Sequence, residues 1–281
     1  MSTFRASDEQ YGSVQLTDHI SLARAAALSA TLDQDVAFQD GDPLPELWHW
    51  MYFWPLARLR ELGNDGHPRK GNFLPDLGLP RRMWAGGRLH FHASLEIGQP
   101  ATRRSSILGV EEKVGRSGRL GFVTVKHELM TPRGLAIEEE QDIVYREAYT
   151  PGARAPEPAA APADALWQRA IRPTEALLFR YSALTFNGHR IHYDRSYATR
   201  EEGYADLVVH GPLIATLLVD LVRRELPLVL VKTFSFKAVR PTLLGQPFVL
   251  CGEPAADGKS VELWARDHEG WVTMRARATL T

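Results

Sequence analysis

The chain has 281 residues, of which 44% are hydrophobic, and this is enough to bury one large core or two of ordinary size. Its 33 basic and 34 acidic side chains give a formal net charge of -1, so no bulk attraction to nucleic acid or to an anionic membrane is indicated. The single cysteine, Cys251, excludes an internal disulfide and a cysteine-rich metal site. Its position in a strand-like run predicts an inert core residue.

The first residues, MSTFRASDEQYG, are polar and acidic, which is not the pattern of a secretory signal. No apolar run reaches the roughly 18 to 20 residues that a membrane helix needs. We therefore expect a cytoplasmic protein without nucleic-acid or membrane partners.

Two elements are predicted before the first sheet. Thr17 is typical of a helix N-cap, and the apolar spacing behind it predicts an amphipathic helix through about Leu32. Residues 42 to 62 hold three of the seven tryptophans; Pro45 is well placed for a helix start, and Pro55 would interrupt that helix. The aromatic density suits either a core or a flat ligand wall, and we favour the core.

Residues 63 to 87, GNDGHPRKGNFLPDLGLPRRMWAGG, contain glycine and proline too often for a helix or a strand, so a long loop is predicted. Ordered loops of this length tend to be functional. Arg69, Lys70, Arg81 and Arg82 make it the most basic loop of the chain. Two interpretations stay open: a solvated loop, or a loop that contacts a phosphate or a carboxylate.

Strand patterns follow this loop. Alternating side chains predict a strand at 89–97, and a meander of three more is predicted at 102–114, 120–130 and 135–146. Hairpin connections of this kind imply an antiparallel sheet. Residues 148–163, AYTPGARAPEPAAAPA, hold four prolines and predict a stiff, extended linker, where we place the domain boundary.

The second half repeats the plan of the first. A helix, PLIATLLVDLVRREL, is predicted to begin at Gly211 or Pro212, and because it is apolar nearly all round for two turns it should be enclosed by protein. Four strands are predicted after it, at 229–239, 248–253, 259–267 and 271–280. The letters L-H-F-H-A and G-Q-P of the first half match F-S-F-K-A and G-Q-P of the second. We therefore predict an α+β double hotdog, each half an antiparallel sheet wrapped around a central helix, with halves at 1–147 and 164–281.

Groups able to carry protons concentrate between Leu178 and Leu213, in the segments SALTFNGHRIHYD and LVVHGPL. Together these segments closely resemble the hotdog-fold hydratases and dehydratases that act on acyl thioesters. Within that group they look most like the type 2 3-hydroxyacyl-thioester dehydratases and the bacterial mesaconyl-CoA and itaconyl-CoA hydratases. The segment GHPRKGNFLPDLGLPRRMWAGG also looks like the N-terminal half of that branch, so the resemblance covers most of the chain.

The resemblance implies which residues form the site. The (R)-specific enoyl-CoA hydratases carry a D-x-N-x-x-H segment; on this chain its His falls on His192, its Asp on Asn187 and its Asn on His189. An amide cannot exchange protons, so the usual sharing of one water between Asp and His does not carry over unchanged. The dehydratase branch that the chain resembles has the same N-x-H-x-x-H form.

Hydration of an enoyl thioester needs a base for the water, a proton for the α carbon and donors for the enolate oxygen. His192 suits the first task because an unperturbed imidazole has a pKa of about 6.5. Asn187 can hold the water without titrating, and syn addition follows as a hypothesis. The free amides at the start of the 211–225 helix suit the oxygen, so we predict the Gly211 N–H as a donor, with His210 orienting this turn.

Basic side chains are predicted to bind the anionic groups of the substrate. The candidates for a free carboxylate of a dicarboxylate substrate are Arg81, Arg82 and Arg180. The candidates for the coenzyme A phosphates are Arg190, Arg195, Lys237 and Arg240. His189 and His210 are added as substrate contacts, although a purely structural role of His189 and Asp194 stays open. Tyr181 and Tyr193 are predicted as wall residues.

No metal is predicted at His189 and His192, because no Glu lies between them and no third ligand clusters with them. The first functional hypothesis is a cofactor-free hydro-lyase acting on a short branched dicarboxylic enoyl-CoA of the mesaconyl or itaconyl class. In it, the first half only shapes the acyl pocket. The second is a 3-hydroxyacyl-thioester dehydratase of fatty-acid metabolism, with CoA or ACP as carrier, and the third is a non-catalytic acyl-thioester binding protein. The expected partner is a small acyl-CoA, and a homo-oligomer stays open.

Overall fold

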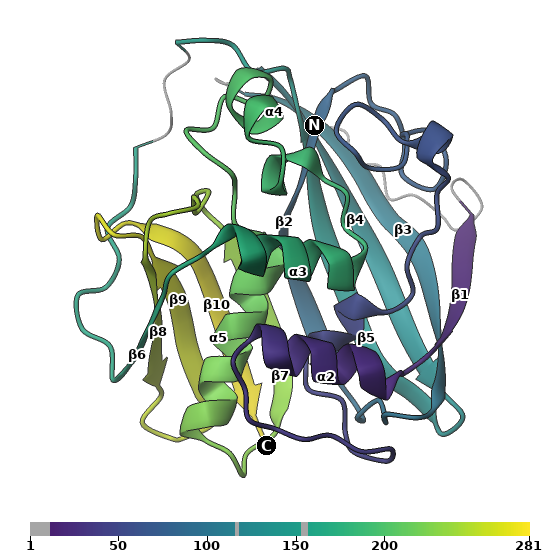
Figure 1. Cartoon of the computed structure of the whole chain (residues 1–281), viewed down its shortest axis with the longest axis vertical. Helices are drawn as coiled ribbons and strands as arrows, with labels where there is room; N and C mark the ends of the chain where they lie inside the picture. The colour runs from purple at the N-terminus through teal and green to yellow at the C-terminus, as the bar shows by residue number, and fades with distance from the viewer. Residues whose placement is uncertain (1–11, 116–117, 153–156) are drawn as a thin grey trace.

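The computed structural model describes residues 12–115, 118–152 and 157–281, and it contains one ten-stranded antiparallel sheet whose helices pack on one face (Figure 1). The strands are β1 (Ser13–His19), β2 (Arg81–Phe91), β3 (Pro100–Gly115), β4 (Gly118–Thr131), β5 (Gly134–Arg146), β6 (Trp167–Ile171), β7 (Val231–Ala238), β8 (Phe248–Pro254), β9 (Ser260–Arg266) and β10 (Val272–Leu280). The helices are α2 (Leu22–Thr31), α3 (Glu175–Thr185), α4 (Arg195–Arg200) and α5 (Gly211–Glu225), with short 3-10 turns η1 (Trp48–Met51), η2 (Leu59–Glu61) and η3 (Arg190–His192). The predicted α+β double hotdog is confirmed.

The strand order shows the internal repeat. It runs β1-β3-β4-β5-β2 in the first half and then β7-β10-β9-β8-β6, which is the same order reversed. The halves join along β2 and β7, where Leu89 pairs with Phe234. These two residues hold corresponding places in the repeated letters, so an approximate two-fold axis passes between them.

The two halves differ in their helices. In the second half α5 lies in front of the strands, and every residue from Leu213 to Val222 is buried (Figure 1). In the first half, the described segment 52–80 contains four prolines and only the three-residue η2, so the helix that was considered from Pro45 does not form beyond η1. Aromatic side chains fill this space instead: Trp48 and Tyr52 are each 1% exposed, which confirms the core interpretation.

The predicted N-cap at Thr17 is wrong. Thr17 lies in β1 opposite Thr102, and the two hydroxyl groups are 3.0 Å apart. The helix begins later, at Leu22, behind Ser21. The segment around Thr17 forms a strand rather than a helix because, as an edge strand paired with β3, it gains a ladder of backbone hydrogen bonds.

The predicted loop at 63–87 is wrong in its last part, which is the start of β2. Gly86 and Gly87 made this part look irregular, yet the sheet needs both. A Cβ added to Gly86 would lie 2.6 Å from the Phe236 oxygen, and one added to Gly87 would lie 2.9 Å from the Glu140 oxygen. Glycine in a strand marks such a close backbone approach.

The predicted strand at 89–97 also ends too late, because β2 stops at Phe91. Beyond it the chain turns toward the aromatic segment, where Leu44 N–H donates to the Leu95 oxygen at 2.7 Å. The other predicted strands and the helix at 211–225 are confirmed to within a few residues. Cys251 is 1% exposed, and burial raises the pKa of its thiol, as expected of an inert core cysteine.

The N-terminal segment MSTFRASDEQYG lies almost wholly outside the described residues, and so does part of the predicted linker at 148–163. The described end of that linker is tied down: Ala161 N–H donates to the Gly270 oxygen and Val272 N–H to the Ala159 oxygen, each at 2.9 Å. Of the helices described, none is long and apolar enough to cross a membrane.

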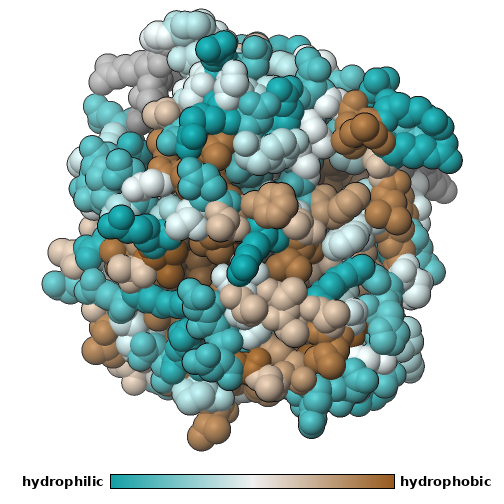
Figure 2. Space-filling view, in the orientation of Figure 1, coloured by the Kyte–Doolittle hydropathy of each residue, from teal (hydrophilic) through white to brown (hydrophobic). Residues whose placement is uncertain are grey.

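Hydrophobic side chains gather across the middle of the helix-bearing face, over α2 and α3, with hydrophilic residues around them (Figure 2). Large exposed side chains on these elements include Leu22, Phe179 and Phe186. Phe186 stacks on Trp54 with ring centroids 4.9 Å apart. This apolar surface therefore reaches the turn that precedes Asn187, where the predicted site begins.

Candidate active site

His192 ends η3 and is 7% exposed. Its Nδ1 lies 2.7 Å from the Val208 backbone oxygen. A carbonyl oxygen can only accept, so Nδ1 carries the hydrogen, and Nε2 of the neutral ring keeps its lone pair. Burial lowers the pKa of His192 to about 4, while the hydrogen bond to Val208 acts in the opposite direction. The ring is therefore neutral near pH 7, with one nitrogen available as a base.

Four imidazole rings form a row in the order His210, His192, His189 and His67. His210 stacks on His192 with centroids 3.7 Å apart and planes at 18°, and His189 stands edge-on to His192 at 5.5 Å. The His67 ring lies 4.5 Å from that of His189. Burial is the main cause that lowers the pKa of His67 to about 3, of His189 to about 2 and of His210 well below its ordinary value. The row consists of neutral rings.

His210 joins the start of α5 to α3. It is the residue before α5, is fully buried, and its Nε2 lies 2.8 Å from the Ser182 hydroxyl oxygen. Its Nδ1 has no hydrogen-bond partner within the described part of the chain. The ring also stacks on His192, so it lies between that ring and the start of α5. The orienting role of His210 and its direct contact with substrate stay predictions.

Gly211 is the first residue of α5. A Cβ added there would meet only the Met274 Cε, at 3.9 Å, and its φ is not positive, so neither packing nor backbone conformation requires glycine. The first amides of a helix lack partners within it, Pro212 has no N–H, and the helix dipole adds positive potential at this end. The Gly211 N–H is one of these first amides, and its role as a donor to a ligand oxygen stays a prediction.

Asn187 closes the turn after α3. Phe186 caps the helix in the left-handed region with φ 51°, and Asn187 N–H donates to the Ser182 oxygen at 2.8 Å. The Asn187 Oδ1 accepts the N–H of His189 at 3.0 Å. The side chain is thus engaged in the turn, and its role in holding water stays a prediction. No partner is recorded for its Nδ2 group among the residues that the structure places.

The basic loop docks on this turn and brings the first half into the site. Arg190 N–H donates to the Asp65 oxygen at 2.9 Å. A Cβ on Gly188 would lie 2.8 Å from the Gly66 oxygen, and one on Gly66 would overlap the Gly188 oxygen, so both glycines permit the contact. His67 meets His189 as a result, a contact that sequence reasoning missed.

Two of the predicted arginines, Arg81 and Arg82, line a small cavity of about 20 Å³ together with His189. Both are already paired. Arg81 forms an ion pair with Glu202, and Arg82 Nε lies 3.4 Å from Asp65 Oδ2. Their acidic partners hold both arginines in the wall of the cavity.

Arg146 lines the same cavity and was not predicted. It ends β5 directly opposite Arg81 on β2, so the hairpin register is the signal that would have found it. Its backbone pairs in the sheet, but its side chain has no hydrogen bond or salt bridge among the described residues. It is therefore the cation of this cavity that is still available to a ligand.

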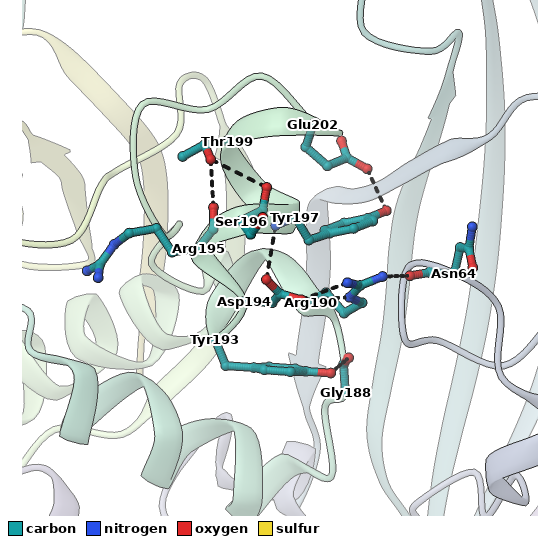
Figure 3. A network of polar contacts seen from close by, with 10 residues as sticks. All are labelled: Asn64, Gly188, Arg190, Tyr193, Asp194, Arg195, Ser196, Tyr197, Thr199 and Glu202. Carbon is teal, nitrogen blue, oxygen red and sulfur yellow. Dashed lines mark hydrogen bonds and ion pairs between the residues drawn. The ribbon is translucent and has the colours of Figure 1, made fainter.

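The other predicted cations lie apart from this cavity. Arg180 is exposed on α3, and Lys237 is exposed on β7. Arg190 bonds Asp194 at 2.7 Å and the Asn64 oxygen at 3.0 Å, within the polar network that holds residues 188–202 in place (Figure 3). In the same network the Tyr193 hydroxyl donates to the Gly188 oxygen at 3.0 Å (Figure 3).

Arg195 and Arg240 also have acidic partners. Arg195 Nε lies 2.7 Å from Asp206 Oδ1, and Arg240 Nη1 lies 3.5 Å from Asp267 Oδ2. Binding of coenzyme A phosphates by these residues stays a prediction. Tyr181, predicted as a wall residue, is 2% exposed, and burial is the main cause that raises its pKa.

A double hotdog sheet in which a neutral histidine of fixed tautomer lies beside the start of a buried helix has the architecture and the groups of an acyl-thioester hydratase or dehydratase. The chain belongs to the hydroxyacyl-thioester dehydratase type 2 family, whose model matches residues 47–244. It is 47% identical over 270 residues to the mesaconyl-C(4)-CoA hydratase of Chloroflexus aurantiacus, covering 95% of this chain and 94% of that protein.

More distant relatives support the same family and fold. The mitochondrial hydroxyacyl-thioester dehydratase type 2 of Schizosaccharomyces pombe is 27% identical over 231 residues, covering 73% of this chain and 76% of that protein. The crystal structure of a MaoC-like dehydratase from Phytophthora capsici superposes with a TM-score of 0.69 at 12% identity, covering 98% of this chain and 99% of that one. At that identity the structural match concerns the fold alone.

Proposed function

We propose that this protein is a hydro-lyase that adds water reversibly across the double bond of a short dicarboxylic enoyl-CoA of the mesaconyl-CoA class. The observation that carries the substrate class is the 47% identity to the Chloroflexus mesaconyl-C(4)-CoA hydratase over nearly the full length of both chains. The reaction type is supported independently by His192, whose Nδ1 is bonded to Val208 so that Nε2 keeps its lone pair, and whose ring stacks on His210 directly before the first amide of α5.

In this proposal His192 carries one proton from the water to the α carbon. Its Nε2 takes a proton from water while the water oxygen bonds to the β carbon. The double-bond electrons shift toward the thioester oxygen, which the Gly211 N–H stabilises as an enolate. The imidazolium then returns the proton to the α carbon and restores the thioester carbonyl. One base acting on one face gives syn addition.

The neutral environment explains how His192 can work without an acid at position 187. No carboxylate hydrogen-bonds to any of the four rings within the described residues. Burial lowers the pKa of His192 to about 4, which makes the neutral ring a weaker base toward water and its protonated form a stronger acid toward the α carbon. A neighbouring carboxylate would stabilise the imidazolium and slow this second step.

Arg146 supports a dicarboxylic substrate. Arg81 and Arg82 are neutralised by Glu202 and Asp65, whereas Arg146 lines the same cavity without such a partner in the described chain. An arginine can bind a carboxylate through two parallel hydrogen bonds. In this proposal Arg146 binds the free carboxylate, and Arg81 and Arg82 hold the wall around it.

The test is a comparison of initial rates on mesaconyl-CoA, itaconyl-CoA, crotonyl-CoA and a 3-hydroxyacyl-CoA. We expect kcat/KM to be highest on mesaconyl-CoA. Faster turnover of crotonyl-CoA than of either diacid would reject the diacid class, and turnover of the 3-hydroxyacyl thioester alone would support the dehydratase alternative. Binding of all four without turnover would support the non-catalytic alternative.

A further inference from the structure

The repeated letters L-H-F-H-A place two histidines on the outer face of the sheet, at the centre of the molecule. Along β2, Leu89 is 3% exposed and Phe91 packs against the same core. Side chains alternate along a strand, so His90 points to the opposite face, and His92, the first residue after β2, lies beside it. Glu138 of β5 is the direct partner of His90 in the ladder and joins them there.

These three side chains are already close. The two imidazole centroids lie 4.0 Å apart, and His92 Nε2 is 2.9 Å from Glu138 Oε2. One ligating atom from each residue falls within 4.8 Å of the other two. Elsewhere in residues 12–115, 118–152 and 157–281, no other three His, Cys, Asp or Glu side chains meet in this way.

We propose that His90, His92 and Glu138 bind a divalent first-row transition metal ion, with zinc as the representative. Two imidazole nitrogens and one carboxylate oxygen form a ligand set that zinc takes, with water in the remaining position. Paired strands supply His90 and Glu138, and His92 directly follows β2, so the three ligating atoms are already near one another. A hard ion such as Mg²⁺, which prefers oxygen ligands, suits this set poorly.

Lys126 helps to prepare the carboxylate. Its Nζ lies 3.2 Å from Glu138 Oε1, which leaves Oε2 toward the histidines. The ion would link β2 to β5 beside the β2–β7 junction, and it would stabilise the folded state because the unfolded chain lacks this arrangement.

The test is a calorimetric titration of Zn²⁺ into the full chain after removal of metal with a chelator. We expect one equivalent to bind and the midpoint of thermal unfolding to rise. His90→Ala, His92→Ala and Glu138→Gln should each weaken Zn²⁺ binding by about tenfold or more, since each removes one of three ligands. The matched control is His268→Ala, an exposed histidine in the turn before β10, which should bind Zn²⁺ as the parent does. Mg²⁺ should give no heat of binding.

A second readout is the visible absorption of bound Co²⁺, which reports nitrogen and oxygen ligands of low coordination number. Unchanged Zn²⁺ affinity in the His90→Ala/His92→Ala double variant would overturn the proposal. So would a Co²⁺ spectrum identical to that of the free ion. The three variants should retain hydration activity, because they lie on the face away from α5, so failure of this proposal and failure of the proposed reaction are distinguishable.

Discussion

The two halves each carry a buried histidine on a 3-10 turn, but one ring bonds a carboxylate and the other bonds a backbone carbonyl. His49 of η1 lies with its Nε2 3.0 Å from Glu139 Oε2, deep in the first half. Glu139 also accepts from Trp50 and Gln141, each at 2.8 Å. Burial acts to raise the pKa of Glu139, but the interactions with His49, His127 and Gln141 together outweigh it and lower that pKa to about 2.

His192 of η3 has no such carboxylate and bonds a backbone oxygen instead. A backbone carbonyl fixes the tautomer as firmly as a carboxylate would, but it adds no charge. The Nε2 of His192 keeps its lone pair, whereas the Nε2 of His49 is held by a buried carboxylate and its Nδ1 has no hydrogen-bond partner among the described residues. The two buried rings therefore differ in the charge of the group that each one bonds.

The largest expected effect separates these two histidines by function. His192→Gln should lower kcat by about 10³-fold, within the range typical of loss of a general base, and leave the thermal midpoint nearly unchanged. His49→Gln should lower the midpoint and leave kcat per folded molecule near that of the parent. Steady-state rates and circular dichroism on both variants decide it. Loss of kcat in His49→Gln, with folding intact, would contradict the comparison.

Glu139→Ala should have the next largest effect, and it should be on stability. It leaves the buried Trp50 and His49 donors without an acceptor, so the free energy of unfolding should fall by about 3 to 5 kcal/mol. Glu140→Ala is the matched control on the same strand; it breaks an exposed pair with Arg88 and should cost less than about 1 kcal/mol. Urea unfolding measures both. Equal losses of unfolding free energy would mean that the buried Glu139 network contributes no more to stability than the exposed Glu140–Arg88 pair.

Much of this fold could be predicted from the sequence because the repeat is written in it. The G-Q-P turns, the alternating strands and the apolar residues 211–225 are local patterns, and each became the predicted element. Thr17 and the glycines at 86 and 87 were misjudged because partners more than 50 residues away decide their structure. Local propensity does not contain such partners.

The site divides in the same way. The N-x-H-x-x-H spacing and the Gly-Pro helix start led to His192 and Gly211, since both signals are local. Arg146 and His67 were missed because one depends on the β2–β5 register and the other on a contact between two glycine turns. The pairing of Arg81 and Arg82 with acids was equally invisible, because Glu202 and Asp65 come from distant segments.

The two regions should also differ in their response to acid. The pKa values of His67, His189 and His192 in the folded protein are about 3, 2 and 4, below the 6.5 of the ordinary side chain. At any pH between the folded pKa of one of these histidines and 6.5, the unfolded chain binds more protons than the folded protein. The contribution of the three histidines to stability is therefore complete above about pH 6.5 and is lost as the pH falls toward 4 and lower. Glu139, with a pKa of about 2 against 4.5, loses its contribution only below pH 4.5.

Urea unfolding measured between pH 7 and 4.5 should therefore report mainly on buried histidines. His67→Gln should make the loss of stability in that interval shallower by up to one proton. Glu139→Gln should leave the slope there unchanged and flatten it below pH 4.5. A parent protein whose stability is independent of pH across the upper interval would show that the histidine row is not neutral.

Arg146 provides a smaller effect that depends on the substrate. Arg146→Met should lower kcat/KM on mesaconyl-CoA by about 10- to 100-fold, the range expected for loss of a charged hydrogen bond of about 1.5 to 3 kcal/mol. It should change the rate on crotonyl-CoA little, since that acyl group has no second carboxylate. Arg180→Met, on the exposed face of α3, is the control and should change neither. Equal losses on both substrates would assign Arg146 to the shape of the cavity rather than to the carboxylate.

Gly211→Ala should have the smallest effect. The new Cβ would meet only the Met274 Cε at 3.9 Å, so the free energy of unfolding should change by less than about 1 kcal/mol. In the proposed reaction the thioester oxygen binds at the Gly211 N–H, and a methyl group on the same residue would hinder its approach. We expect kcat to fall by about tenfold, less than the 10²- to 10³-fold typical when a whole oxyanion donor is removed. The double variant Gly211→Ala/Met274→Leu tests the cause: it should keep the defect if the methyl group displaces substrate, and recover if it acts by displacing Met274.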